Sequence, residues 1–292
     1  MRQTVIAAGR SAIHGYALLT SPWRPYPDFL VIGAKRGGST SFYYDLLRHS
    51  QIYPLFPRPE HLPKAAATKG VHYFDVNFAR GSHWYRAHMP STAVRQFAQR
   101  RTGGPVVVGE ASPYYLFHPL AAERAARVVP DTKIIVVLRD PVQRAYSHWK
   151  ERWRNKLESL SFADALAAED ERVGDAEARL LADPHFYSYA HEQLSYARQS
   201  EYGPALARWY DHFPRERILV LCSEEYFAEP DAVLGSAHGF LGLPREQVAS
   251  GSVLNAARGS DLDAAGVAEL AGRFAASNRR LTELTGRLFP WA

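Results

Sequence analysis

Apolar runs and helical segments alternate along the chain. Four short apolar runs have the pattern of strands buried on both faces, and they lie at 29–33, 106–109, 134–138 and 218–222. Segments with helical periodicity lie between and after these runs, at 40–49, 119–129, 142–155, 161–170, 192–212 and 265–285. This alternation predicts an α/β fold in which a parallel central sheet is flanked by helices.

The domain organisation is expected to be simple. The chain has no internal repeat and no low-complexity linker that would separate two domains. Residues 1–27 end in a proline-rich stretch, which predicts an N-terminal lead-in segment, and residues 28–292 are expected to form a single domain. The 292 residues, of which 46% are hydrophobic and 22% charged, suit a globular domain with a large core.

Charge and cysteine content narrow the possible partners. The 35 basic and 30 acidic residues give a net charge of +5, which is too small to indicate a nucleic-acid partner and is compatible with an anionic ligand. Cys222 is the single cysteine, so the chain has no intrachain disulfide, which fits a reducing cytoplasm. Because Cys222 ends an apolar run, we interpret it as a buried, inert thiol.

The N-terminal residues carry no convincing export signal. Arg10 and His14 interrupt the apolar pieces of residues 1–20. No uninterrupted stretch approaches the roughly 20 apolar residues of a membrane span. We therefore expect no stable membrane insertion and a cytoplasmic location.

A glycine-rich, cationic turn directly follows the first apolar run. Its sequence is Gly33-Ala34-Lys35-Arg36-Gly37-Gly38-Ser39-Thr40. Where a strand passes into a helix, free backbone N–H groups and the positive end of the helix dipole converge, and glycines let an anion approach the main chain. The cations at 35 and 36 and the hydroxyls at 39 and 40 add side-chain donors, so the turn predicts a phosphate-binding loop.

The turn differs from a Walker loop in one respect. Gly33 and Gly38 have the Walker spacing, but Ser39 stands where a Walker loop has the lysine that reaches the outer phosphates. The loop therefore favours anion binding and speaks against ordinary magnesium-dependent nucleotide hydrolysis. The alternative is a glycine-rich connection whose two cations are simply solvated.

A second segment predicts another phosphate contact. The apolar run that ends at Leu138 is followed by Arg139-Asp140-Pro141 and by a segment typical of a helix. Arg139 is expected at the carboxyl end of a strand, and Ser147 about two helical turns further on, so a guanidinium and a hydroxyl could hold a phosphate together. The alternative is that Arg139 pairs with Asp140 or caps a neighbouring element.

Together, the two segments resemble the sulfotransferases that use 3′-phosphoadenosine-5′-phosphosulfate (PAPS). Further stretches resemble the heparan-sulfate branch of that family and its bacterial relatives: Lys69-Gly70-Val71-His72-Tyr73-Phe74-Asp75, Glu110-Ala111-Ser112-Pro113-Tyr114-Tyr115, Phe240-Leu241-Gly242-Leu243-Pro244 and Leu288-Phe289-Pro290-Trp291. The resemblance runs from about Asp28 to the C-terminus. It implies a P-loop-like sulfotransferase fold and in-line transfer of a sulfonate group from PAPS, without a metal, to a hydroxyl or amine of a glycan, glycolipid or secondary metabolite.

The resemblance also implies roles for individual residues. It assigns the 3′-phosphate of the nucleotide to Arg139 and Ser147, with a further contact from Arg258, which matches a basic loop of the heparan branch. It assigns the 5′-phosphosulfate to the first loop, that is to Lys35, Arg36, Gly37, Gly38, Ser39, Thr40 and Ser41. The product left after transfer would be 3′-phosphoadenosine-5′-phosphate (PAP).

Two departures from the heparan branch bear on catalysis. Gly70 stands where that branch has a glutamate, its proposed base, and Ala111 stands where it has a lysine. The base must take a proton near pH 7, which suits His72, and Glu110 is the rival. His72 could instead be bonded beneath an aromatic cluster, and Glu110 could be a structural carboxylate. Lys35 is expected to neutralise charge on the departing phosphate.

Several alternatives stay open. A P-loop kinase would need magnesium and ATP, and a catalytically inactive nucleotide-binding protein would keep the phosphate contacts without a base. The proline-rich stretch 50–69 and the segment 168–189 are candidate rims of an acceptor cleft. The identity of the acceptor and the oligomeric state do not follow from the sequence.

Overall fold

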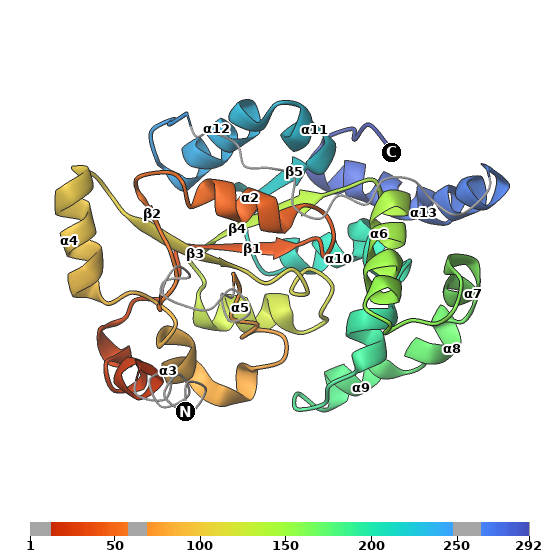
Figure 1. Ribbon diagram of the computed structural model, residues 1–292, viewed down its shortest axis with the longest axis horizontal. Coiled ribbons are helices and arrows are strands. Elements are labelled where there is room, and N and C mark those ends of the chain that lie inside the picture. The colour runs from red at the N-terminus through yellow and green to blue at the C-terminus, as the bar shows by residue number, and fades with distance from the viewer. Residues whose placement is uncertain (1–12, 58–68, 248–263, 292) are drawn as a thin grey trace.

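A parallel sheet forms the centre of the molecule (Figure 1). The computed structural model describes residues 13–57, 69–247 and 264–291. Within these ranges the sheet has five strands in the order β2-β3-β1-β4-β5, and all neighbouring pairs are parallel. The strands are β1 (Phe29–Gly33), β2 (Ile52–Tyr53), β3 (Val107–Ala111), β4 (Lys133–Leu138) and β5 (Ile218–Cys222).

Helices cover the sheet and extend beyond its edges (Figure 1). The α-helices are α2 (Ser39–Leu46), α3 (Gly81–Arg86), α4 (Thr92–Thr102), α5 (Ala121–Val128), α6 (Pro141–Arg154), α7 (Phe162–Ala167), α8 (Glu169–Val173), α9 (Ala176–Ala182), α10 (Tyr202–Tyr210), α11 (Ser223–Ala228), α12 (Pro230–Leu241) and α13 (Ala264–Thr285). Shorter helical turns are η1 (Ser21–Trp23), η4 (Phe78–Arg80), η5 (Ala190–Leu194), η6 (Arg198–Ser200) and η7 (Arg215–Arg217). No helix of the described ranges is long and apolar enough to cross a membrane.

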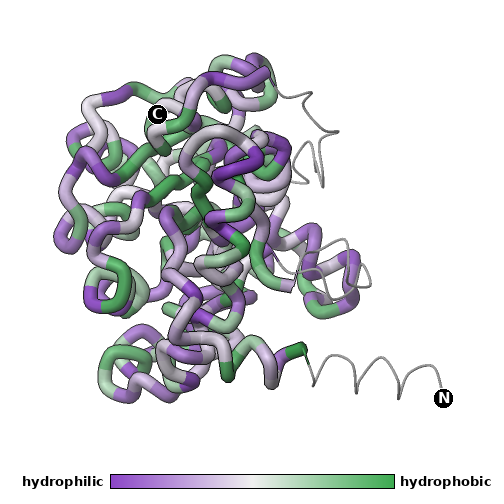
Figure 2. Tube along the Cα trace, turned by 90° about the vertical axis from the view of Figure 1, so that its left-hand side faces the viewer, coloured by the Kyte–Doolittle hydropathy of each residue, from purple (hydrophilic) through white to green (hydrophobic). Residues whose placement is uncertain are grey.

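Successive residues of the central strands pack against opposite helical layers, because side chains alternate across a sheet. In β1, Leu30 and Ile32 join the cluster formed with α5, α10 and α13. Phe29 and Val31 join the cluster formed with α2, α11 and α12 on the other face. Figure 2 shows hydrophobic segments running through the centre of the molecule. The predicted α/β class with a helix-flanked parallel sheet is confirmed.

Some predicted elements differ from the structure. The range 192–212 is not one helix: η5 and η6 precede α10, and the chain between them is irregular. The buried guanidinium of Arg144 explains the break, since it donates to the backbone carbonyl of Tyr196 and to Ser200 Oγ. The range 161–170 is divided between α7 and α8, and the two-residue strand β2 was too short to be predicted.

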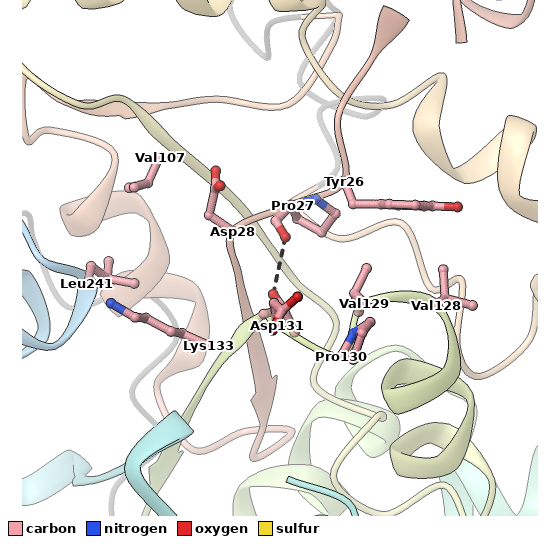
Figure 3. Close-up of a pocket in the computed structure, with 11 residues that line it drawn as sticks. Tyr26, Pro27, Asp28, Val107, Val128, Val129, Pro130, Asp131, Lys133 and Leu241 are labelled. Carbon is pink, nitrogen blue, oxygen red and sulfur yellow. Dashed lines mark hydrogen bonds between the residues drawn. The ribbon is translucent and has the colours of Figure 1, made fainter. Parts of the chain in front are cut away.

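The strand direction defines two edges of the sheet. The carboxyl ends of β1, β3, β4 and β5, the four strands that the sequence predicts, lie at one edge, next to the glycine-rich turn. A pocket lies at the opposite edge, where Asp28 and Val107 adjoin the amino ends of β1 and β3 and Lys133 begins β4 (Figure 3). This pocket is therefore separate from the glycine-rich turn.

Candidate active site at the carboxyl edge of the sheet

The glycine-rich turn enters α2 in a conformation suited to an anion. Gly38 precedes the helix with a φ of 93°, in the left-handed region that favours glycine, and no side chain caps the helix. Ser223 Oγ is buried without a hydrogen-bond partner in the described structure, and a Cβ at Gly38 would lie 3.0 Å from it. The first turn of α2 thus has no side-chain cap, and an unsatisfied hydroxyl lies beside it, an arrangement that suits an anion.

The second predicted segment adjoins this turn. Arg36 Nε donates to Ser147 Oγ over 3.3 Å, which joins the turn directly to α6. Arg144 Nη1 donates to the carbonyl oxygen of Lys35 at 3.2 Å. Burial, together with the neighbouring Arg139 guanidinium, lowers the pKa of Arg36. The structure therefore brings both predicted phosphate-binding segments into one basic region.

Lys35 contacts a segment that the sequence did not connect with the site. Its Nζ donates to Gln193 Oε1 at 2.7 Å and to the Glu192 carbonyl at 3.2 Å, and it lies 3.5 Å from Glu192 Oε1. Burial lowers the pKa of Lys35 to about 8, although the Glu192 carboxylate partly offsets this effect. The Lys35 side chain thus joins the glycine-rich turn to η5.

Aromatic contacts fix η5 in this position. The Tyr114 hydroxyl is hydrogen-bonded to His191 Nδ1 at 2.7 Å, and Phe117 stacks on the same imidazole at a centroid distance of 4.4 Å. The Tyr187 hydroxyl donates to Glu192 Oε2 at 3.0 Å. Part of the predicted rim, segment 168–189, therefore does lie near the loop, whereas residues 58–68 of the other rim lie outside the described residues.

His72 forms a pair with Asp75. His72 has a φ of 51°, a left-handed conformation that is uncommon for a residue other than glycine and often marks functional sites. Its Nδ1 lies 2.7 Å from Asp75 Oδ2, and Asn77 Nδ2 donates to the His72 carbonyl at 3.0 Å. Burial acts to lower the pKa of His72, but the Asp75 carboxylate outweighs it, so the pKa is raised above its ordinary value.

Glu110 is buried and surrounded by hydrogen-bond donors. Its Oε2 accepts from the Val71 amide at 2.5 Å and from Ser112 Oγ at 2.7 Å. Its Oε1 accepts from the hydroxyls of Tyr85 and Tyr115 at 2.8 and 2.9 Å. Burial raises the pKa of Glu110 despite these bonds. This geometry favours the structural interpretation of Glu110, in which the carboxylate holds the chain that leads to His72.

The two departures from the heparan branch have steric explanations. A Cβ at Gly70 would lie 2.3 Å from the carbonyl oxygen of Ala111 and 2.4 Å from Ser112 Oγ, so this backbone cannot hold a glutamate there. Ala111 is fully buried in the apolar cluster beneath α2, where a lysine would lie among hydrophobic side chains. Neither missing side chain could be restored without moving the backbone.

Sequence reasoning also missed a lysine. Lys69 Nζ donates to Thr40 Oγ1 at 2.6 Å and to Ser39 Oγ at 3.3 Å. The sequence assigned no role to Lys69, although this residue ends the basic, proline-rich stretch 50–69 that was predicted as a rim and begins the stretch that leads to His72. Cys222 is buried, and its pKa is raised to about 11 by burial, as expected for an inert thiol. Arg258 lies outside the described residues.

The fold and the site define a P-loop-like α/β protein with a glycine-rich, cationic turn between β1 and α2. The sequence profile of the Sulfotransferase family matches residues 27–247, and the chain belongs to this family. It is 28% identical to human heparan sulfate glucosamine 3-O-sulfotransferase 6 over 251 residues, which is 86% of this chain and 62% of the relative. It is 27% identical to the bifunctional heparan sulfate N-deacetylase/N-sulfotransferase 1 of Caenorhabditis elegans over 75% of this chain and 22% of that protein. The chain thus spans less than two thirds of these relatives.

A solved structure has the same architecture. The crystal structure of a sulfotransferase from Alicyclobacillus acidocaldarius superposes with a TM-score of 0.63 and 27% sequence identity. The superposition covers 91% of this chain and 99% of the other. This likeness confirms the P-loop-like sulfotransferase fold.

Proposed function

We propose that this protein is a PAPS-dependent sulfotransferase that sulfates a hydroxyl or amine of a glycan, glycolipid or secondary metabolite. The observation that carries this proposal is the contact between the two basic segments, with Arg36 bonded to Ser147. PAPS carries phosphate groups at two separate positions, so one bound molecule would need both basic segments close together. Membership of the Sulfotransferase family supports the same conclusion.

The residues present fit PAPS. Arg139 and Ser147 would hold the 3′-phosphate, with Arg258 as a further proposed contact. The loop from Lys35 to Ser41, with the uncapped first turn of α2, would hold the 5′ end. When bound, PAPS supplies the sulfonate group and a phosphate leaving group, whose negative charge the Lys35 ammonium would stabilise.

His72 is the proposed base. Because Nδ1 faces the buried Asp75 carboxylate, the neutral ring keeps its proton on Nδ1, and Nε2 has the lone pair that takes the acceptor proton. Asp75 fixes this tautomer and stabilises the imidazolium that forms. Glu110 acts as a positioning residue through the Val71 amide and Ser112. The cytoplasmic location and the division into a lead-in and one domain stay predictions.

Two measurements test the proposal. Calorimetry compares the binding of PAP with that of magnesium ATP, and radiolabelled PAPS is used to measure transfer to candidate acceptors. We expect PAP to bind more tightly than magnesium ATP. Lys35→Met should reduce transfer by about 10²- to 10³-fold, the effect of losing one charge-stabilising donor.

The exposed Lys156 offers a matched control. Lys156→Met removes the same charge away from the proposed contacts and should leave transfer unchanged. Tighter binding of magnesium ATP than of PAP would favour the kinase alternative. PAP binding without transfer to any hydroxyl or amine would favour the inactive nucleotide-binding protein.

A further inference from the structure

Lys69 points its ammonium at the phosphate-binding loop. Its two hydrogen bonds end on Thr40 Oγ1 and Ser39 Oγ, both in the first turn of α2. An ammonium has three N–H donors, and within the described residues only these two hydroxyls accept from it. One donor is therefore available to a ligand at the start of α2.

The charge of Lys69 has no counter-charge in the described part of the chain. No ion pair joins its Nζ to a carboxylate there. Burial, with a smaller effect from the Arg36 guanidinium, lowers the pKa of Lys69 to about 7. A partly buried cation without a counter-charge is unfavourable, so this arrangement favours an anionic ligand beside Thr40.

The ammonium lies beside the residue that corresponds, by sequence spacing, to the magnesium-coordinating hydroxyl of a Walker loop. Ser39 stands where a Walker loop has its lysine, so Thr40 stands where such a loop has the hydroxyl that coordinates magnesium. In this protein the hydroxyl of Thr40 is bonded to an ammonium instead. We propose that Lys69 is a donor-binding residue that contacts the 5′ end of PAPS as a built-in cation at this position. The inference rests on the proposed function.

The surrounding backbone explains why the cation comes from Lys69. The amide of Ala111 donates to the carbonyl oxygen of Lys69 at 2.8 Å, so the two residues lie side by side. Ala111 is where the resemblance to the heparan branch leads one to expect a lysine, and its side chain is buried in the apolar cluster under α2. Lys69 reaches the loop from the adjacent chain and supplies the missing charge.

Binding should therefore be coupled to proton uptake. With a pKa of about 7, Lys69 is mostly neutral at pH 7.5, and a bound anion favours its protonated form. Lys69 should therefore take up a fraction of a proton when PAP binds at that pH. Lys35, whose pKa is about 8, would contribute a smaller share.

The test uses calorimetry with PAP and with adenosine 3′-phosphate at pH 7.5, each in two buffers of different ionisation enthalpy. Lys69→Met should weaken PAP binding by about 10- to 100-fold, the range of a charge-assisted hydrogen bond, and should lose most of the proton uptake. It should leave adenosine 3′-phosphate binding unchanged, because that nucleotide lacks the 5′-phosphate. Comparison with the wild type removes the contribution of the nucleotide itself.

Two further variants separate charge from loop structure. Thr40→Val removes the hydroxyl but keeps the ammonium, so the proton uptake should persist. Lys156→Met, at an exposed position, should behave as the wild type. The assignment would be overturned if Lys69→Met took up as many protons as the wild type, or if it bound PAP and adenosine 3′-phosphate more weakly by the same factor. Loss of the proton uptake in Thr40→Val would overturn it as well.

The outcomes also distinguish this inference from the proposed function. If the wild type fails to bind PAP, the proposed function is wrong and the inference fails with it. If the wild type binds PAP and transfers sulfonate while Lys69→Met is indistinguishable from it, only the role of Lys69 is wrong.

Discussion

Replacement of Gly70 tests the steric basis of the altered catalytic site. A Cβ at this position would lie 2.3 Å from the Ala111 carbonyl oxygen and 2.4 Å from Ser112 Oγ. Neither atom can move freely: the Ala111 amide is bonded to Lys69, and Ser112 Oγ donates to Glu110 and accepts from the His72 amide. Gly70→Ala must therefore displace the chain that leads to the proposed base.

The expected loss of stability follows from these contacts. Overpacking costs about 1–3 kcal/mol, and the strained hydrogen bond of Ser112 adds about 1 kcal/mol. We expect Gly70→Ala to lower the free energy of unfolding by about 2–4 kcal/mol, which corresponds to a fall in Tm of roughly 5–15 °C. Gly70→Glu, which introduces the residue of the heparan branch, should be at least as destabilising and should not increase transfer.

Urea and thermal unfolding measure both variants. Gly272 in α13 is the matched control, since a Cβ there would meet no atom within 4 Å. Gly272→Ala should leave the stability unchanged or raise it by about 0.5–1 kcal/mol, as for an alanine in a helix. Wild-type stability of Gly70→Glu together with faster transfer would show that the glutamate fits, and the steric reasoning would then be wrong.

Two other substitutions test the site electrostatics. In Asp75→Asn the carboxylate that raises the pKa of His72 is lost and burial dominates, so the pKa of His72 falls and the acidic limb of the kcat profile should move to lower pH. An unmoved limb would exclude His72 as the titrating base. In Glu192→Gln the Lys35 ammonium loses its neighbouring carboxylate, which we expect to compete with the nucleotide for this cation. Calorimetry should therefore show that PAP binds about fivefold more tightly to this variant. Weaker binding would contradict competition between Glu192 and PAP.

Local pattern was sufficient to predict the central strands. β1 and β4 are continuous apolar runs because both of their faces are covered by helices, and this leaves a clear signal. The strand β2 has two residues and no comparable pattern. The helix expected over 192–212 is interrupted because Arg144, distant in sequence, binds backbone and side-chain groups inside that range. Such tertiary contacts leave no periodic trace.

In the candidate site, too, features set by local sequence were predictable and features set by tertiary contacts were not. The position of the glycine-rich turn between β1 and α2 was predictable because its glycines and cations directly follow a clear strand signal. Glu192 was not predictable, since its contact with Lys35 joins residues 157 positions apart through the packing of η5 on Tyr114. Asp75 is only three residues from His72 in the stretch Lys69–Asp75, but its contact with His72 was not predictable. The left-handed turn at His72 brings the two side chains together.

Three cations of the candidate site have pKa values that burial lowers, and this affects both the stability of the protein and the charge of the ligand it should favour. Burial is the largest influence on Lys35, Arg36 and Lys69, and it lowers the pKa of each. A lysine whose pKa is lower in the folded than in the unfolded state loses protons on folding, so between about pH 7 and its unfolded pKa the stability rises with pH. At neutral pH these groups therefore oppose folding, and an anion that favours their protonated forms offsets that cost. A phosphate group bound at the glycine-rich turn, as proposed, would lie beside these cations, so the charges that weaken the free protein should favour an anionic ligand over a neutral one.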